Sequence, residues 1–175
     1  HSIRTLTTTN TENIINGTSD WVYEEELGVR DGFRWSPDGK SIAFWQFDES
    51  GVRRYTMVDH VSRLYPELKS FGYPKVGQRN SACRVGVVSF DGRKTRWMAT
   101  PGDSRNHYIA RMEWAENSDE LVIQQLNRAQ NTNNVMLVSA SDGSANPILT
   151  EHSDTWIDAH NEMRWVRDGD AFTWI

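Results

Sequence analysis

The sequence has very little cysteine: Cys83 is the single one among 175 residues. One cysteine excludes a disulfide within the chain and any metal site built from several thiolates. A free cysteine is commonly buried as a small apolar residue, so we expect Cys83 inside a strand. The five histidines are scattered without an HExxH motif or comparable ligand spacing. We therefore expect no metal site and no cofactor.

Long apolar runs and an excess of basic charge are missing as well. No segment approaches the roughly 18 apolar residues of a membrane-spanning helix, and no basic region followed by an apolar stretch opens the chain. The net charge is −5 and 37% of the residues are hydrophobic. This composition suits a domain with a core and gives no indication of nucleic acid binding. Because the chain starts at His1 and stops inside an expected strand, we interpret it as a piece of a longer protein.

Helical periodicity is nearly absent, and a repeated strand pattern takes its place. Three segments share the order tryptophan, turn-forming residues, hydrophobic run; they are FRWSPDGKSIAFWQF (33–47), ARMEWAENSDELVIQQL (110–126) and MRWVRDGDAFTWI (163–175). In SIAFWQF both alternating faces are largely apolar, which indicates a strand covered on both sides. Trp114 and Trp165 are 51 residues apart, close to the repeat of about 40–50 residues in β-propeller blades. We predict an all-β fold, a partial β-propeller.

The repeats divide the chain into five parts. We expect the end of a preceding blade at 1–20, an acidic segment at 21–32, a blade at 33–100 with an arm inserted at 51–82, a second blade at 101–150, and the start of the next blade at 151–175. A propeller needs about four to eight blades to close its ring. This chain supplies about two to three four-stranded antiparallel blades, so it would leave strand edges and apolar blade faces uncovered.

The expected arm is basic in an otherwise acidic chain. Residues 51–80 contain six basic residues against two acidic ones. Pro66 and Pro74 disfavour helical backbone at the residues before them, Tyr65 and Tyr73, and so favour an extended projection. Two interpretations remain open at this point. The segment is either a long solvated loop or an extension that binds a partner.

The stretch WVYEEE, residues 21–26, places three consecutive carboxylates after two aromatic residues. Neighbouring carboxylates that are held together in a cavity repel each other, and either the pKa of one rises or a cation binds. A primary ammonium has three N–H donors, which two carboxylates and one further acceptor satisfy. A peptide's free α-amino group is largely charged at neutral pH and is one such cation.

Two other interpretations of the triplet are possible. The acids could belong to a short helical turn after Asp20, solvated and favourably placed near its positive end. A carboxylate pair can also supply the acid and base of glycoside hydrolysis, but adjacent residues seldom provide the facing geometry that this reaction requires.

NGTSDWVYEEE (16–26) resembles the double-glutamate motif of the dipeptidyl peptidase IV family. Further motifs follow in the order of that family, and the likeness extends from Ile14 to the end of the chain. They are WSPDGK (35–40), YPKVG (73–77), HYIARMEW (107–114) and QLNRAQN (125–131). The stretch SDTWIDAHNEMRW (153–165) is more similar to bacterial members than to the animal enzymes.

The resemblance implies an eight-bladed propeller beside an α/β-hydrolase domain of the same parent chain. Members are serine exopeptidases that release N-terminal dipeptides with proline or alanine in second position, so peptide N-termini are the implied substrate. The family's two glutamates fall on Glu25 and Glu26, which would bind the substrate's α-ammonium. Trp21, Tyr23 and Glu24 would support them. The arm implies a homodimer, through Tyr65, Tyr73, Pro74 and Lys75. A periplasmic or extracellular location is also implied.

The G-x-S-x-G motif that carries the hydrolase nucleophile does not occur in the sequence. We therefore expect no catalytic residue here and no hydrolysis by this chain alone. The alternative is a non-enzymatic β-propeller scaffold or protein-interaction module, in which the acidic triplet is only a solvated turn.

Overall fold

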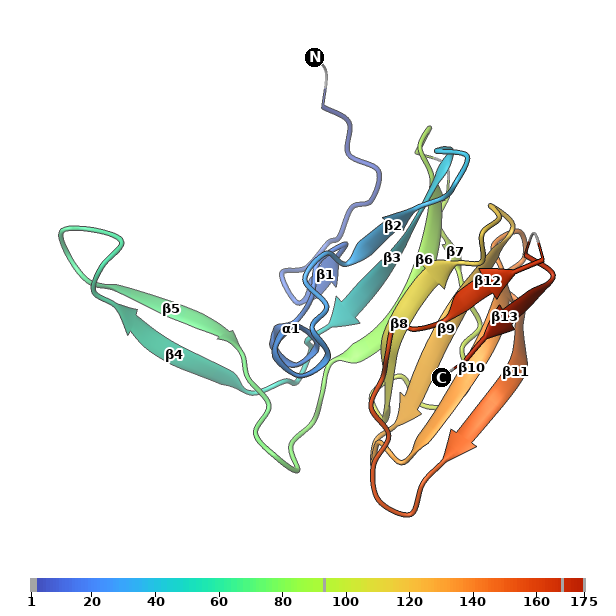
Figure 1. Cartoon of the computed structure of the whole chain (residues 1–175). Coiled ribbons are helices and arrows are strands. Elements are labelled where there is room, and N and C mark those ends of the chain that lie inside the picture. Colours follow the sequence, from blue (N-terminus) through green and yellow to red (C-terminus); the bar gives the residue numbers. More distant parts are fainter. Residues whose placement is uncertain (1–2, 93, 168, 175) are drawn as a thin grey trace.

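A computed structural model of the protein describes residues 3–92, 94–167 and 169–174. Antiparallel strands dominate this part of the chain, and they form two main sheets and two separate hairpins (Figure 1). The helix α1 (Trp21–Leu27) lies beside the first sheet. The prediction of an all-β fold with a short helical segment at the acidic motif is confirmed. Within the described residues, no helix has the length and apolar character needed to cross a membrane.

The first sheet is built around its two longest strands. These are β3 (Ser41–Asp48) and β6 (Ala82–Ser89), which pair along their whole length. Two short strands share the other edge of β3, β1 (Ile14–Asn16) and β2 (Phe33–Trp35), while β7 (Arg96–Trp97) extends the sheet beyond β6. The expected division placed residues 1–20 in a preceding blade. Instead, β1 belongs to this sheet because it pairs with the C-terminal half of β3.

The core of the first sheet explains its repeated sequence pattern. Residues 43–47 of β3 are all buried, as its apolar residues on both faces predict. Cys83 is buried in β6. On one face Phe33 and Trp35 stay half-exposed and line an apolar cavity of about 370 Å³ with Phe44. In a propeller a neighbouring blade covers such a face.

The second sheet is a regular four-stranded meander. Its strands follow the chain in the order β8 (His107–Trp114), β9 (Glu120–Asn127), β10 (Thr132–Ser139) and β11 (Ala145–His152). After it comes a small hairpin of β12 (Arg164–Val166) and β13 (Ala171–Thr173). These strands lie where the second blade and the start of the next blade are expected.

The arm is a hairpin between β3 and β6 that projects away from both sheets (Figure 1). Its strands are β4 (Arg54–Asp59) and β5 (Glu67–Gly72). At the tip, four apolar side chains are strongly exposed: Val61, Leu64, Tyr65 and Leu68. Since exposed apolar clusters commonly mark interaction sites, this tip is a candidate contact surface.

Hydrogen bonds from indole rings join the two main sheets. The Nε1 of Trp45 in β3 donates to the Ile109 carbonyl of β8 at 2.9 Å, and the Nε1 of Trp114 in β8 donates to the Arg34 carbonyl of β2 at 3.1 Å. Arg34 also forms an ion pair with Glu113 at 2.6 Å. A buried indole N–H usually needs such a partner. The sheets therefore hold a fixed relative position, with a common apolar core between them.

Candidate functional site

The acidic helix sits on an excursion from the edge of the first sheet. The amide of Gly17 donates to the Trp45 carbonyl at 3.0 Å, and the amide of Trp45 donates to the Gly32 carbonyl at 3.0 Å. The chain thus leaves the edge of β3 opposite Trp45 and returns to it opposite the same residue. Residues 18–31 therefore form a closed loop that carries α1. A Cβ atom on Gly32 would lie 2.4 Å from the Thr18 carbonyl oxygen. Only glycine allows this close approach at the neck of the loop.

Local capping groups define both ends of α1. The Asp20 carboxylate accepts from the Tyr23 amide at 2.9 Å, and Gly28 ends the helix in a left-handed conformation with φ of 66°. A helix of seven residues is marginal in isolation, so packing must stabilise it. Val22, Tyr23 and Leu27 supply that packing, since they are the buried residues of the helix.

Tyr23 fastens the helix to the second sheet. Its ring packs edge-on against Phe47, with 4.6 Å between ring centroids. Its hydroxyl accepts a hydrogen bond from the Ile109 amide at 2.9 Å. Burial raises the pKa of Tyr23 well above its ordinary value, which keeps the hydroxyl neutral. Tyr23 therefore connects α1 to both main sheets, through Phe47 and through Ile109.

Arg111 holds the other end of the helix. Its Nη1 donates to the carbonyl of Leu27, the last residue of α1, at 2.7 Å and to the Ala110 carbonyl at 2.7 Å. Its Nη2 donates to the Ala159 carbonyl at 3.2 Å. Desolvation lowers the pKa of this half-buried guanidinium, which nevertheless stays charged at neutral pH. No local sequence signal marks Arg111, because nothing in HYIARMEW indicates a contact with a helix more than eighty residues earlier.

Trp21 joins the helix to the arm. Its ring lies 4.1 Å from that of Tyr73, centroid to centroid. The four residues expected to form a dimer arm are therefore not in one place. Tyr65 is 78% exposed at the tip, whereas Tyr73 and Pro74 are half-buried at the base and Lys75 is exposed beside them.

All three glutamates of the triplet, Glu24, Glu25 and Glu26, are exposed at the surface of this chain. Successive helical residues point about 100° apart around the axis, so the carboxylates fan out instead of sharing one direction. The described residues therefore do not enclose Glu25 and Glu26 in a cavity. A closed cation site at this helix requires a surface from outside the chain.

Two further carboxylates lie near the N-terminal end of the helix, those of its N-cap Asp20 and of Glu49. Burial raises the pKa of Asp20, and it also raises the pKa of Glu49, with the nearby charge of Asp20 acting in the same direction. Arg54 lies 3.9 Å from Glu49 and partly offsets this effect. The surroundings of α1 are thus acidic and favour a bound cation. Among the described residues no cluster of three or more His, Cys, Asp or Glu side chains is arranged to hold a metal ion.

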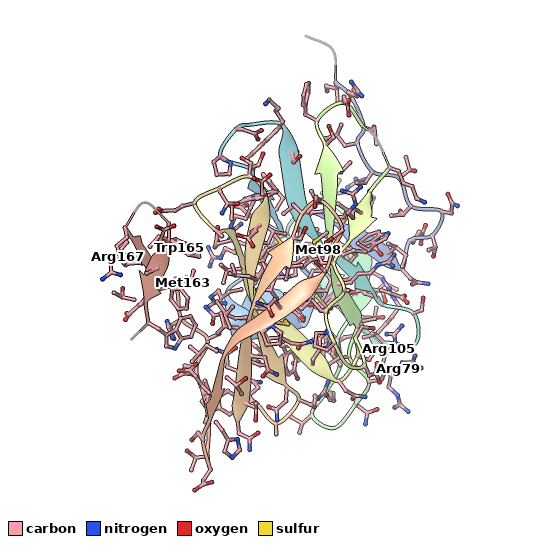
Figure 2. All side chains as sticks on the ribbon, turned by 90° about the vertical axis from the view of Figure 1, so that its right-hand side faces the viewer. Arg79, Met98, Arg105, Met163, Trp165 and Arg167 are labelled. Carbon is pink, nitrogen blue, oxygen red and sulfur yellow. The ribbon has the colours of Figure 1, made fainter. Side chains whose placement is uncertain are left out.

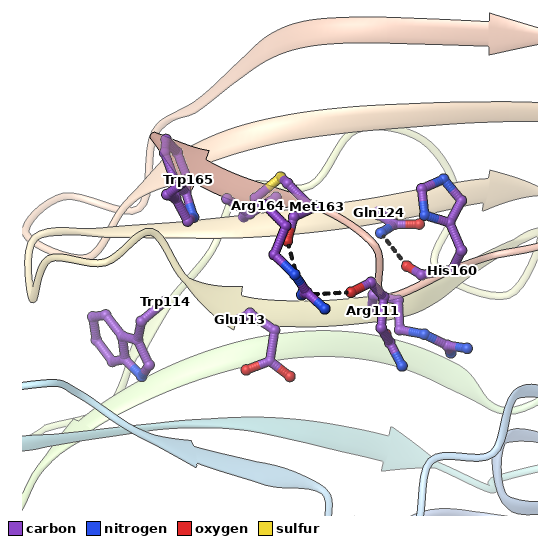
Figure 3. A pocket seen from close by; sticks show the side chains of 10 residues that line it. Arg111, Glu113, Trp114, Gln124, His160, Met163, Arg164 and Trp165 are labelled. Carbon is purple, nitrogen blue, oxygen red and sulfur yellow. Dashed lines mark hydrogen bonds between the residues drawn. The ribbon is translucent and has the colours of Figure 1, made fainter. Parts of the chain in front are cut away.

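A cavity of about 380 Å³ lies on the far side of Arg111 (Figure 3). Arg111, Glu113 and Gln124 line it from the second sheet, and Arg164 and Trp165 line it from β12. Gln124 donates to the His160 carbonyl at 2.8 Å. This bond holds the segment between β11 and β12 against the second sheet. Arg111 therefore stands between this cavity and the acidic helix.

Comparison with known proteins identifies the architecture. The family described as the dipeptidyl peptidase IV (DPP IV) N-terminal region matches residues 1–175. The chain belongs to this family. The crystal structure of Porphyromonas gingivalis dipeptidyl peptidase 4 matches with a TM-score of 0.79 and 36% identity over 87% of the chain and 22% of that structure. A putative dipeptidyl aminopeptidase IV from Bacteroides ovatus matches with a TM-score of 0.82 and 26% identity, over 94% of the chain and 23% of that structure.

Curated relatives of this DPP IV N-terminal region differ in what their names state. Inactive dipeptidyl peptidase 10 of Mus musculus is 36% identical over 95% of the chain and 22% of its own length. Probable dipeptidyl peptidase 4 of Neosartorya fischeri is 29% identical over 87% of the chain and 21% of its own length. The chain thus spans about a fifth of these proteins. Because one of the two is named inactive, similarity in this region does not decide whether a parent protein is active.

Proposed function

We propose that this chain is the substrate-recognition part of a DPP IV-like serine exopeptidase that removes N-terminal dipeptides of the Xaa-Pro or Xaa-Ala type. In this proposal Glu25 and Glu26 bind the α-ammonium of the substrate, and an α/β-hydrolase domain elsewhere in the parent chain carries the chemistry. The observation that supports it best is the rigid mounting of α1. The loop that carries α1 is closed at its neck, and contacts at both ends and on two sides hold the helix. The carboxylates of Glu24, Glu25 and Glu26 are nevertheless exposed.

A solvated acidic turn does not require that mounting. Tyr23 and Arg111 connect α1 to β8 of the second sheet, and Trp21 connects it to the base of the arm. Preorganised carboxylates bind an ammonium better than mobile ones, because less side-chain entropy is lost on binding. In the parent protein the hydrolase domain would supply the enclosing surface. An ammonium enclosed there would form charge-assisted hydrogen bonds, whereas a blocked amine would leave the carboxylates without a counter-charge.

The test uses the full-length protein with Gly-Pro anilide and its N-acetylated form. Glu25→Gln and Glu26→Gln keep the side-chain shape and remove one charge each. We expect either change to lower kcat/KM for the free-amine substrate by more than about tenfold, as expected when one partner of an enclosed charge pair is lost. Glu162→Gln, another exposed glutamate, serves as the control. Activity of Glu25→Gln and Glu26→Gln within twofold of wild type would refute the assignment.

A non-enzymatic scaffold is the second candidate function. The name of the mouse relative, an inactive dipeptidyl peptidase, is the observation that favours it. In that case the parent protein would not cleave the free-amine substrate at all. It would still bind peptide N-termini if the acidic helix keeps its role, and a fluorescent Gly-Pro peptide measures this binding without turnover.

We also propose that the parent protein is a homodimer that forms through the arm. The exposed apolar tip supports this proposal, since a projecting hairpin with two unpaired edges and uncovered leucine and tyrosine side chains favours association. The contact of Tyr73 with Trp21 connects the base of the same arm to the acidic helix. A dimer contact at the tip would therefore also reduce the motion of the arm against α1.

A further inference from the structure

We infer that Arg111 is a positioning residue for the acidic helix: it compensates the charge at the C-terminal end of α1 and so fixes the directions of Glu25 and Glu26. The inference rests on the proposed function, because it concerns the same glutamates. It adds a residue from the next blade, eighty-four positions along the chain from Leu27, to the substrate-recognition site.

The electrostatics of α1 create the need for this arginine. The C-terminal end of a helix carries a partial negative charge, and acidic residues there are unfavourable. Glu25 and Glu26 immediately precede the final residue of α1, and the last turn of the helix contains no basic residue. The helix therefore places two negative side chains at its own negative end. A positive group from outside the helix would offset this unfavourable arrangement.

Arg111 supplies that group with a fixed geometry. Two of its nitrogens bridge three carbonyl oxygens, those of Leu27, Ala110 and Ala159, at 2.7, 2.7 and 3.2 Å. The planar guanidinium allows such a bridge, whereas the point charge of a lysine would satisfy fewer of the acceptors. One side chain thereby binds the terminal carbonyl of α1, the edge of β8 and the segment between β11 and β12.

An irregularity in β8 accompanies this contact. The register of β8 with β9 shifts between Ile109 and Arg111. A β-bulge re-aims the side chains next to it, and bulges are common beside functional sites. The residues on either side of Ala110 both hold α1, Ile109 through its amide to Tyr23 and Arg111 through its guanidinium to Leu27. The bulge thus presents two contacts with one short helix, from residues that flank Ala110.

Arg105 offers a matched control. It also bridges backbone carbonyls between the sheets, since its Nη1 donates to Asp48 at 3.0 Å and to Asn80 at 3.1 Å, and it pairs with the Asp48 carboxylate at 2.8 Å. None of these contacts reaches α1. Figure 2 shows Arg105 beside Arg79, away from Met163 and Trp165 of the segment that leads into and forms β12. Loss of Arg105 therefore reproduces the loss of a bridging arginine without touching the acidic helix.

The experiment compares Arg111→Met, Arg111→Lys and Arg105→Met in the full-length protein, each with and without the pair Glu25→Gln and Glu26→Gln. We expect Arg111→Met to lower kcat/KM for Gly-Pro anilide by about tenfold while the acetylated substrate changes less than twofold. The kcat/KM of Arg111→Lys should lie between those of wild type and Arg111→Met. This variant provides the comparison if Arg111→Met does not fold. When Glu25→Gln and Glu26→Gln are both present, the additional loss of kcat/KM from Arg111→Met should shrink below twofold.

Arg105→Met should lower the melting temperature without changing the ratio of kcat/KM for the free-amine substrate to kcat/KM for the acetylated substrate. If Arg111→Met lowers kcat/KM by the same factor in both backgrounds, or changes only the melting temperature, the inference is overturned while the proposed function stands. If Glu25→Gln and Glu26→Gln together leave kcat/KM unchanged, the proposed function fails, and the inference fails with it.

Discussion

The hydroxyl of Tyr23 and the amide of Ile109 form a hydrogen bond of 2.9 Å that joins the acidic helix to the neighbouring blade. The carbonyl of the same Ile109 accepts from the Trp45 indole at 2.9 Å. A side chain from α1 and one from β3 thus satisfy both backbone groups of one residue on the edge of β8. Because unpaired buried backbone groups are costly, this residue fixes how the two blades meet.

Tyr23→Phe should destabilise the interface between the two blades. The change removes the acceptor of the buried Ile109 amide and keeps the ring, so the expected cost is about 1–3 kcal/mol for an unsatisfied buried donor. The melting temperature of the full-length protein and the hydrogen exchange of residues 107–112 report this change. Tyr55→Phe, on a tyrosine that is 49% exposed in the arm, should leave both measurements unchanged. Equal exchange in the two variants would contradict the role of the hydrogen bond.

Gly32→Ala should open the neck of the loop that carries α1. The new Cβ atom would lie 2.4 Å from the Thr18 carbonyl oxygen and 2.5 Å from the Thr18 nitrogen, both backbone atoms that cannot rotate away. We expect a loss of about 1–3 kcal/mol, as for other overpacked sites. Gly72→Ala is the control, since the three atoms nearest to its Cβ would all belong to the end of the flexible Glu49 side chain. A smaller loss for Gly32→Ala than for Gly72→Ala, measured by melting temperature, would contradict this account.

Much of this fold was predictable from the sequence. The apolar run of β3, the Asp-Gly turns and the spaced tryptophans lead to paired strands and blades because they reflect local and periodic rules. The short helix at the acidic motif also followed from Asp20 and the acidic turn after it. The assignment of Ile14–Asn16 to the first sheet did not, since three residues carry too little pattern to choose between two neighbouring sheets.

The support of the candidate site was less predictable. Gly32 matters through its distance from Thr18, and Arg111 matters through a carbonyl on a distant helix. Neither relationship leaves a local signal in a single sequence. The exposure of Glu25 and Glu26 was not predictable either, because the surface proposed to enclose them lies outside this chain.

Asp20→Asn should change how stability depends on pH. Burial raises the pKa of Asp20 in the folded protein above its unfolded value, so the folded state holds this proton more tightly. The contribution of Asp20 to stability is then fully present below pH about 3.9 and is lost as the pH rises through the folded pKa. Asparagine keeps the cap without a charge. The variant should therefore gain stability relative to wild type between pH 4 and 7, which melting temperatures across that range measure.

Two further variants check the sign of this effect. Asp20→Ala removes the cap itself and should cost about 0.5–2 kcal/mol across the range. Asp38→Asn should behave in the opposite way, because hydrogen bonds from Ser36 and Lys40 lower the pKa of Asp38 to about 2. Its carboxylate stabilises the fold above the unfolded pKa, and this contribution is lost as the pH falls towards the folded pKa. If Asp20→Asn and Asp38→Asn shift stability in the same direction, the assignment of the Asp20 pKa is wrong.

Charges at the tip of the arm should dissociate the proposed homodimer. Leu64 and Leu68 are 91% and 74% exposed in this chain, and an aspartate at each would place two charges where an apolar contact is proposed. We expect the variant with Leu64→Asp and Leu68→Asp to sediment as a monomer at micromolar concentration, while the wild-type full-length protein sediments as a dimer. Val76→Asp, on a fully exposed residue outside the hairpin, should leave the dimer intact. A dimer that survives both leucine substitutions but dissociates with Val76→Asp would move the contact from the tip to the base of the arm, where Trp21 and Tyr73 meet.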